Sequence, residues 1–503
     1  MSYVKKTWVN DEIITASDLN RMEDGIDYAV DKADNGGLYG VRWDRTTNLL
    51  TRIKDAENIT TDTTNFKHSG TFNPNINNPF DLLYPWSDIK VCNVDLTAYA
   101  ALSSGDSVRD CITAVYGDPD FTYFGSDSLF VGVYIPEFWY WSEEDSSGKV
   151  SFYISTNNRV GFKHHEEEIR GISFAIDAGN SKVSSGAGVP LANVAVSTIH
   201  SRAHNQGFTI TDIFSDDAVI MLYLVEYANM NAQAALGDGC SSCYRENAAD
   251  VIANLDNSGT ETVFEVTDSV LSSLIYKGTQ VDFGASVGAT TYKAVVKDFA
   301  VSGDTYTITL DRKLSDLTNG MYMSVHGFAT CEFPYIGQSV GNGSGYIGTN
   351  SKANAYYRGM MLWGNRYRYT LGIYRESGTN HIWVCPDGVD PDNYDALNTS
   401  VHQDTETVLP VMGSGAWLTV GGNAQRIAEL CGFMATGTSS GSSSSPVGDQ
   451  QYVPQNSAGN TILLSGGVAN YGWACGLFCG YWNGGAGYSW WDVAASPLLK
   501  KPQ

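Results

Sequence analysis

Positive charge, long apolar runs and closely spaced cysteines are all scarce in this sequence. Lys and Arg number 31 against 55 Asp and Glu, so the formal net charge is −24. A phosphate backbone or an anionic bilayer would be repelled from most of such a surface. No run of about 18 apolar residues occurs, and none follows Lys5 and Lys6. We therefore expect no nucleic-acid partner, no membrane insertion and no signal peptide.

Patterns of catalytic or metal-binding residues are also sparse. The nine cysteines are widely spread, which is typical of a protein made in a reducing cytosol and not of a disulfide scaffold. Cys240 and Cys243 have the spacing of half a zinc site, but no matching second pair exists. His200 and His204 lack the Glu of the metalloprotease motif and a clear helical pattern, which favours a solvated loop. No Gly-x-Ser-x-Gly elbow occurs. We expect no metal, no cofactor and no catalytic residue.

Length and patterning predict an α+β fold with several parts. The chain has 503 residues, of which 43% are hydrophobic, enough for two or three domains with their own cores. Short aromatic and β-branched runs, such as that from Leu129 to Trp141, predict strands joined by long loops. The apolar stretch 215–237 predicts a buried helix that is capped by Ser215 and closed by Gly237.

The N-terminal segment 15–34 has a helical pattern with a narrow apolar seam. Apolar residues stand at alternating spacings of three and four, which is a coiled-coil seam about two heptads long, and two glycines then end the helix. This length leaves two interpretations open. The helix either forms a coiled coil or lies as a single amphipathic helix on its own protein.

The residue pattern changes near residue 251, where segments typical of alternating strands and turns begin. We interpret this part as a small β-rich module inserted into a loop of the main domain. A low-complexity run at 436–446 predicts a mobile loop. The predicted parts are an N-terminal helix at 1–36, the first part of the main domain at 37–250, the inserted module at 251–329 and the second part of the main domain at 330–503.

The stretch from about 465 to 497 is unusually aromatic and contains almost no charge. Large rigid rings on a Gly-, Asn- and Ser-rich frame are typical of recognition surfaces, because they supply contact area while freezing few torsions. The alternative is that they form core and turns, with Trp482 and Trp491 as buried anchors. The Tyr and Trp residues are Tyr471, Trp473, Tyr481, Trp482, Tyr488, Trp490 and Trp491, and the single charge is Asp492.

This stretch resembles the variable proteins of diversity-generating retroelements and their fixed relatives among phage tail proteins. Those proteins end in a C-type-lectin-like domain, which is related in fold to formylglycine-generating enzymes. The segment from Tyr356 to Asn365 resembles the family's Arg-Gly-x-x-x-x-Trp-Gly-Asn signature, and the first residues resemble the opening of many Gram-positive phage tail proteins. The positions that match the family's fixed frame are Gly466, Gly467, Gly472, Gly476, Leu477, Phe478, Ser489 and Val493.

The resemblance implies a phage tail-tip or fibre receptor-binding protein, located in the virion. It implies a hypervariable surface that binds a host cell-surface receptor, either protein or glycan. It also implies that the N-terminal segment 1–36 attaches the chain to other tail proteins and aligns it as a homotrimer. We expect the variable side chains to stand in solvent, so that truncating an exposed one costs within about 0.5 kcal/mol. The candidate binding residues are Val468, Asn470, Tyr471, Trp473, Ala474, Gly480, Tyr481, Asn483, Gly484, Tyr488, Trp490 and Asp492.

Two alternatives accompany this expectation. One is a structural baseplate or tail protein without direct receptor contact, whose terminal aromatics bury against neighbouring subunits. The other is an oxidoreductase like the formylglycine-generating enzymes, working through Cys475 and Cys479. If the segment between these cysteines is extended, they stand roughly 13 Å apart, which is too far for a pair.

Overall fold

The computed structural model describes residues 37–60, 78–236, 243–328, 356–386, 388–420, 425–426, 433–434, 447 and 449–502. The predicted helix at 15–34, with its trimer seam, and the low-complexity run at 436–446 lie outside these ranges. Within them, strands predominate over helices, in agreement with the predicted α+β class. No helix in the described ranges is long and apolar enough to cross a membrane.

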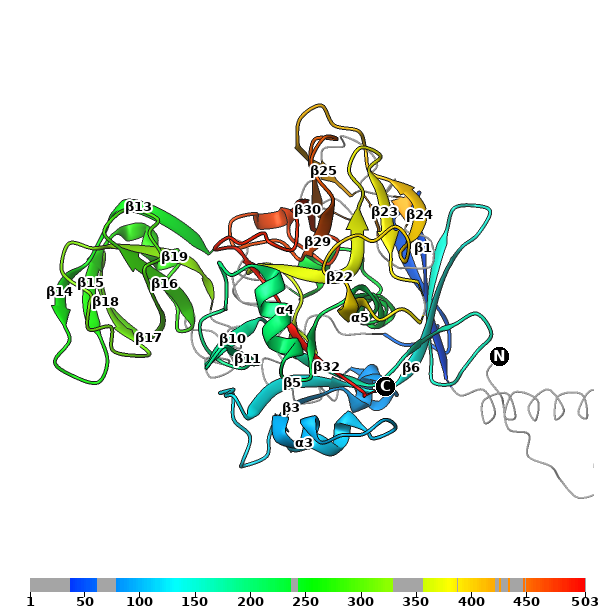
Figure 1. Ribbon diagram of the computed structural model, residues 1–503, viewed down its shortest axis with the longest axis horizontal. Helices are drawn as coiled ribbons and strands as arrows, with labels where there is room; N and C mark the ends of the chain where they lie inside the picture. Colours follow the sequence, from blue (N-terminus) through cyan, green and yellow to red (C-terminus); the bar gives the residue numbers. More distant parts are fainter. Residues whose placement is uncertain are drawn as a thin grey trace, which may run out of the picture.

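The main body contains three large sheets (Figure 1). The first has the order β2-β1-β7-β6-β8 and the second the order β12-β32-β9-β5-β3-β4. Strands of the first are β1 (Leu38–Asp44), β2 (Leu49–Lys54), β6 (Phe138–Glu144), β7 (Val150–Ser155) and β8 (Lys163–His165). Strands of the second are β3 (Lys90–Asp95), β4 (Ile112–Val115), β5 (Leu129–Ile135), β9 (Glu168–Gly171), β12 (Thr209–Ile210) and β32 (Pro497–Lys500).

The third sheet has the order β24-β23-β22-β29-β30-β28-β25, with β31 beside β22. Its strands are β22 (Tyr367–Arg375), β23 (His381–Val384), β24 (Gln403–Val408), β25 (Ala416–Thr419), β28 (Gln450–Val453), β29 (Thr461–Ser465), β30 (Gly480–Gly484) and β31 (Val493–Ala494). Three short hairpins complete the body, formed by β10 (Ala175–Gly179) and β11 (Lys182–Ser185), β20 (Tyr356–Tyr357) and β21 (Met360–Met361), and β26 (Gln425–Arg426) and β27 (Phe433–Met434).

Strand β32 joins the two halves of the chain. It lies between β9 and β12, with Leu499 opposite Ile169 and Leu498 opposite Thr209. Its side chains share a hydrophobic core with residues from β3, β5 and β22. Residues before and after the inserted module therefore fold together as one body.

Helix α5 (Ile213–Tyr227) is buried between the first and third sheets, where it contacts β1, β7 and β22. Burial agrees with the prediction, but both predicted ends are wrong. Asp212 is the cap, because its carboxylate accepts from the backbone N–H groups of Phe214 and Ser215. The helix ends at Tyr227, since Ala228 has a left-handed φ of 49°. The other helices are α3 (Leu96–Ala100), α4 (Val196–His204) and α6 (Ala232–Leu236).

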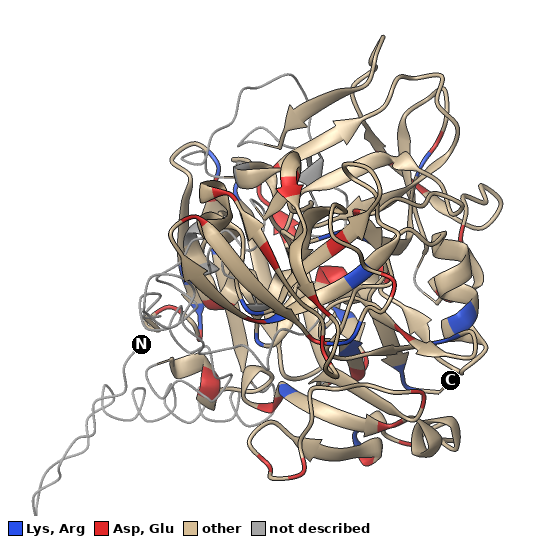
Figure 2. Ribbon diagram, turned by 90° about the vertical axis from the view of Figure 1, so that its left-hand side faces the viewer, with Lys and Arg blue, Asp and Glu red and all other residues tan. Residues whose placement is uncertain are grey.

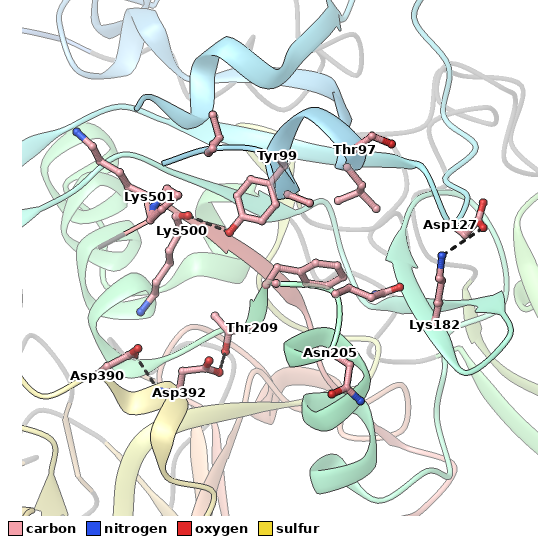
Figure 3. Close-up of a pocket in the computed structure, with 17 residues that line it drawn as sticks. Thr97, Tyr99, Asp127, Lys182, Asn205, Thr209, Asp390, Asp392, Lys500 and Lys501 are labelled. Atoms are coloured by element: carbon pink, nitrogen blue, oxygen red, sulfur yellow. Dashed lines mark hydrogen bonds and ion pairs between the residues drawn. The ribbon is translucent and has the colours of Figure 1, made fainter. Parts of the chain in front are cut away.

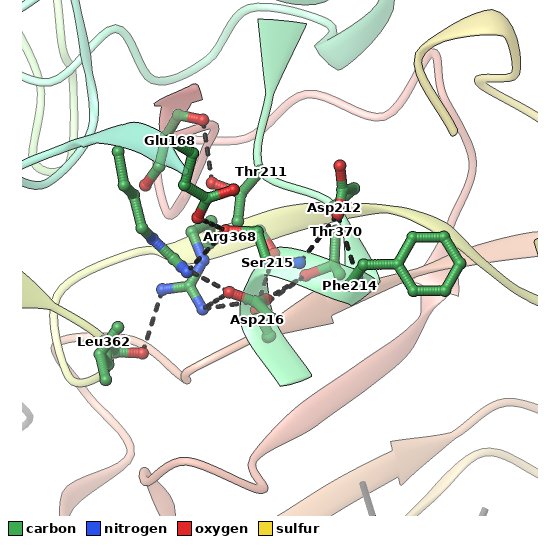
Figure 4. A network of polar contacts seen from close by, with 12 residues as sticks. Glu168, Thr211, Asp212, Phe214, Ser215, Asp216, Leu362, Arg368 and Thr370 are labelled. Carbon is green, nitrogen blue, oxygen red and sulfur yellow. Dashed lines mark hydrogen bonds and ion pairs between the residues drawn. The ribbon is translucent and has the colours of Figure 1, made fainter. Parts of the chain in front are cut away.

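Buried charges fix the start of α5 against two sheets (Figure 4). Asp216 lies 2.5 Å from Arg170 of β9 and 3.0 Å from Arg368 of β22, and it also accepts from the Thr370 hydroxyl at 3.0 Å. The two guanidinium groups lower the pKa of Asp216 against the opposing effect of burial. All three charged side chains are buried. The attraction between the carboxylate and the two guanidinium groups therefore offsets the cost of removing these charges from water.

Residues 244–328 form a separate seven-stranded antiparallel unit, which we call the module (green, left, in Figure 1). It has its own hydrophobic core and runs in the order β13-β19-β16-β17-β18-β15-β14. The sheet begins at Tyr244, seven positions before the predicted boundary of 251. Its strands are β13 (Tyr244–Val251), β14 (Ala253–Asp256), β15 (Val263–Thr267), β16 (Thr279–Gly284), β17 (Tyr292–Ser302), β18 (Thr305–Leu310) and β19 (Tyr322–Phe328).

The two ends of the module lie side by side. The Gly327 N–H donates to the Cys243 carbonyl at 2.7 Å, and Tyr244 pairs with His326 across the first and last strands. Asn365 of the body exchanges two hydrogen bonds with the backbone of Phe328, at 3.0 and 3.1 Å. Figure 2 views the molecule from the module's side and shows Asp and Glu spread over many elements instead of gathered in one patch.

Candidate recognition surface

Five half-buried aromatic side chains form a connected cluster on the third sheet, which we call the aromatic platform. Each has at least one ring neighbour in the set, at centroid distances from 4.7 to 6.3 Å. The platform consists of Trp417, Tyr452, Tyr471, Tyr481 and Tyr488.

Strand register brings three platform residues to one face of the sheet. Trp417 on β25 stands opposite Tyr452 on β28, and Tyr452 is in register with Tyr481 on the parallel neighbour β30. The rings of Tyr452 and Tyr481 stack at 4.8 Å with an interplanar angle of 22°. Gly415 leaves room for this arrangement, since a Cβ there would come 2.0 Å from the Tyr452 hydroxyl.

Two buried tyrosines of β22 support the platform from below. The Tyr367 ring lies 5.8 Å from that of Tyr471 and 5.3 Å from that of Tyr481. The Tyr369 hydroxyl lies 2.9 Å from both the Gly485 and Tyr488 carbonyl oxygens, which holds the loop after β30. Burial raises the pKa of Tyr471 and Tyr488, so both present neutral phenols at physiological pH.

The predicted binding residues fall into three groups by exposure. Asn470, Asn483 and Trp490 are exposed, and the Trp490 side chain is 55% accessible. The half-buried group consists of Tyr471, Tyr481, Tyr488 and Asp492. The buried group consists of Val468, Ala474, Gly480 and Gly484. The side chain of Trp473 is outside the described set.

For the buried group, the prediction that these positions face solvent is wrong. Val468 is part of the hydrophobic core shared by the second and third sheets. Gly480 and Gly484 lie in β30, which is covered by strands on both sides, and a Cβ on Gly484 would meet Leu464 at 3.2 Å. Ala474 is enclosed in a short 3-10 turn, Gly472–Ala474. Sequence alternation alone does not separate these positions from their exposed neighbours.

The two proposed anchors differ in their surroundings. Trp482 is completely buried and packs with Ile213 and Leu418, as predicted. Trp491 is half-buried and stacks on His326 and Tyr244 of the module. Asp492 follows it, and burial raises the pKa of its carboxyl to about 6, although Arg366 opposes this shift.

Two glycines of the expected frame are required by close approach. Gly466 and Gly467 have φ values of 89° and 75°, in the left-handed region. A Cβ on Gly466 would lie 2.6 Å from the Leu362 carbonyl, and one on Gly467 would lie 2.5 Å from the Cys475 sulfur. Neither position can accept a larger residue without movement of the backbone.

Cys475 and Cys479 are close together, which corrects the expected separation. The Cys479 N–H donates to the Gly476 carbonyl, so the segment turns instead of extending. Both sulfurs converge on Gly467, at 2.5 and 3.0 Å from its ideal Cβ position. Both thiols are buried, and burial raises the pKa of Cys479 well above its usual range. Such a thiol is a poor nucleophile because it stays protonated.

His200 and His204 lie on α4, so the loop predicted for them is wrong. Their ring nitrogens contact opposite oxygens of Asp392, at 2.5 and 2.9 Å. These contacts, with the Thr209 hydroxyl, lower the pKa of Asp392 to about 2 against the effect of burial. Among the described residues, no group of three His, Cys, Asp or Glu side chains is arranged to hold a metal ion.

Sequence reasoning missed the platform residues Trp417 and Tyr452, which precede the aromatic stretch. Both lie on strands of four residues, and nothing in their spacing indicates pairing with β30. No protein-family model matches this chain, and the search of curated proteins found no match.

Proposed function

We propose that this chain is a receptor-binding protein of a phage tail, and that the aromatic platform and its exposed neighbours contact a host cell-surface molecule. The observation that carries the proposal is the platform itself. Five half-buried rings from separate elements stay in mutual contact at the surface of a sheet. A core would enclose them, whereas an adhesion surface keeps such rings ordered and accessible.

The surroundings of the platform support contact with a partner. Asn483 donates to the Tyr481 hydroxyl at 3.3 Å and is itself exposed, as is Asn470 beside Tyr471. Trp490 follows Tyr488 by two residues and has the most exposed ring of the segment among those described. Neutral phenols, amides and an indole offer hydrogen bonds and apolar area together, which is the composition of protein recognition surfaces.

The proposal includes a C-type-lectin-like fold for the body and diversification by a retroelement. Its support is the family resemblance together with the placement of the frame. Gly466 and Gly467 are held by close contacts, whereas Asn470, Asn483 and Trp490 between the frame positions are exposed. The proposed location is the virion, with homotrimeric assembly and attachment to other tail proteins through the N-terminal segment.

Binding of the fluorescently labelled protein to a panel of intact Gram-positive bacteria tests the proposal. We expect binding to at least one strain, and a loss of about tenfold or more in affinity for both Trp490→Ala and Asn483→Arg. Phe124→Ala is the matched control, because Phe124 is 63% exposed and lies outside the aromatic stretch. Cell binding that is unchanged in both variants would place the receptor contact elsewhere on the chain. Absence of binding to every strain would favour the structural tail protein.

A further inference from the structure

The first sheet has an outer face that is aromatic and aliphatic at one end. Its other face packs on the body, because alternate residues of β1, β6 and β7 belong to the hydrophobic core. The remaining residues of these strands therefore face outward. Register places Ile53, Gly40, Tyr153 and Trp141 in one outward row across four strands. A Cβ on Gly40 would come 2.9 Å from the side chains of both Ile53 and Tyr153, so the row is closely packed.

A second outward row lies beside the first, toward the start of β1. It consists of Leu38, Ser155, Trp139 and His164. Trp139 stacks on His164 with ring centroids 4.9 Å apart and planes inclined by 17°. The indoles of both rows are half-buried, and so is the Leu38 side chain. The two rows form a continuous surface where β1 begins, and we call it the apolar end of the sheet.

The opposite end of the same outer face is polar. Arg42 and Glu143 are exposed there, and Arg42 donates to the Ser151 hydroxyl at 3.2 Å. Asp44 and Lys149 form an ion pair at 3.0 Å. The outward face of an antiparallel sheet is commonly polar along its whole length. The apolar end departs from this pattern, which is a mark of surfaces that contact a partner.

The apolar end lies where the N-terminal segment joins the sheet. The heptad seam of 15–34 is separated from Leu38 by residues 35–37 alone. Helices of a coiled coil lie roughly 8 to 10 Å apart, and the connection from residue 34 to residue 38 spans at most roughly 14 Å. In a trimer, Leu38 of each copy would therefore lie within roughly 20 Å of the common axis. This geometry brings the apolar ends of the copies together.

The charge of the chain also favours this place for contact between copies. With a net charge of −24, two copies repel each other over most of their surface. The row from Ile53 to Trp141 carries no charged side chain, and at its border His164 contacts Glu137 at 3.1 Å. The cavity beside β32 is different, since carboxylates and ammonium groups line it, those of Asp390, Asp392, Lys500 and Lys501 (Figure 3).

We propose that the apolar end of the first sheet packs against a second copy of this chain, around the axis set by the N-terminal segment. The inference rests on the homotrimer of the proposed function and adds the surface through which the described bodies meet. A stable interface buries about 800 Å² on each partner, and one large aromatic side chain supplies about 150 to 250 Å² when fully buried. Two half-buried indoles with their aliphatic neighbours supply less, so this contact adds to the coiled coil and does not replace it.

Sedimentation velocity of the full chain over a range of concentrations tests the proposal. We expect a trimer for the unaltered chain. Trp139→Lys combined with Trp141→Lys should raise the concentration at which the trimer dissociates by about tenfold or more, because it places solvated charges in the contact. The matched control is Val270→Lys combined with Val301→Lys, which alters two exposed valines of the module and should leave dissociation unchanged.

Cross-linking gives a second measurement that does not alter the two rows. Val160 is exposed in the loop after β7, and this loop adjoins the entry of the N-terminal segment, since the Thr156 N–H donates to the Gly37 carbonyl at 3.0 Å. A long bis-maleimide should join Val160→Cys chains to one another. Val301→Cys chains should give no more product than the unaltered chain. If the lysine variant does not fold, the cross-link alone decides.

Three results would overturn the contact. Equal dissociation of the sheet variant and its control, without a Val160→Cys product above background, would remove this contact and leave the proposed trimer in place. A monomer at micromolar concentration would remove both. A sheet variant that stays trimeric but unfolds at a lower temperature than the control would assign the apolar end to the chain's own N-terminal segment. Binding to cells is measured separately, so the platform is judged independently of this contact.

Discussion

The indole of Trp491 lies on the imidazole of His326, with ring centroids 4.7 Å apart and planes inclined by 24°. The Arg366 guanidinium lies 5.4 Å from the centroid of the same indole, and the Tyr244 ring stacks on it at 4.9 Å. Trp491 therefore connects the aromatic stretch of the body to the first and last strands of the module.

Trp491→Ala should loosen the module from the body. It removes two ring stacks and one cation–π contact, so the free energy of unfolding should fall by about 2 kcal/mol. Amide hydrogen exchange should also rise at Tyr244 and His326. Trp490→Ala is the matched neighbour and should change stability by about 0.5 kcal/mol or less. Equal losses in the two variants would contradict the role assigned to Trp491.

Removal of the module should leave a folded body. The backbone of Cys243 and Gly327 meets at 2.7 Å, so a short Gly-Ser bridge can replace residues 244–328 without strain. The loss of contacts to Asn365 and Trp491 should lower the unfolding midpoint. Urea unfolding followed by far-UV circular dichroism should nevertheless show one cooperative transition. A broad transition without a folded-state baseline would show that the body depends on the module.

Truncation of Tyr481 should destabilise the protein more than its place in the proposed binding surface suggests. The ring contacts Tyr367, Tyr452 and Trp417, so Tyr481→Ala should cost about 2 kcal/mol. This replaces the sequence-based expectation of about 0.5 kcal/mol. Tyr481→Phe keeps the ring contacts and should stay within about 0.5 kcal/mol of the unaltered chain. Thermal unfolding of both variants distinguishes ring packing from the hydroxyl.

Stability should fall as pH rises from about 4 to about 8, because of Asp449. Burial raises the pKa of its carboxyl to about 8, so the folded chain keeps a proton that the unfolded chain releases near pH 4. The slope from this one group is at most about 1.4 kcal/mol per pH unit. Asp449→Asn keeps an acceptor for the Phe478 N–H and should flatten the profile. Urea unfolding at pH 5 and pH 8 measures this, and an equally steep profile in the variant would refute it.

Asp216→Ala should be among the most damaging single changes. It leaves Arg170 and Arg368 buried beside each other without a carboxylate, at a cost of roughly 3 to 5 kcal/mol. Asp216→Asn keeps two hydrogen-bonding atoms and should lose less. Because the folded pKa of Asp216 is lowered, its contribution is present above the unfolded pKa and is lost as pH falls through the folded one. A small loss for Asp216→Ala in urea unfolding would contradict this.

The sequence correctly predicted those helices and strands that are specified by the pattern of apolar and polar residues within a short segment. The apolar run of α5 indicated a buried helix, and the alternation after residue 251 indicated the module. The ends of α5 were missed because Asp212 competes with Ser215 as a cap and because Ala228, without a glycine, adopts a left-handed conformation. Such choices are decided by tertiary contacts and not by propensity.

The candidate site was predicted in part, and its errors have two causes, long-range packing and one local turn. Exposure of Asn470, Asn483 and Trp490 agreed with expectation, whereas Val468 is buried in a core whose residues come from strands far away in sequence. Trp417 and Tyr452 joined the platform through the same long-range pairing. The approach of Cys475 to Cys479 depends on a turn that the residue spacing does not reveal.

The place of β32 gives the order of synthesis a role in folding. Residues 497–500 fill a central position in a sheet whose other strands all come from before residue 211, so this sheet stays split until the aromatic stretch has been translated. A nonsense mutation within that stretch would remove β32 and leave Ile169 and Thr209 without their partner strand. Under the proposed diversification, chain-terminating variants of this stretch would be removed, because a prematurely terminated chain cannot complete the second sheet and is exposed to proteolysis.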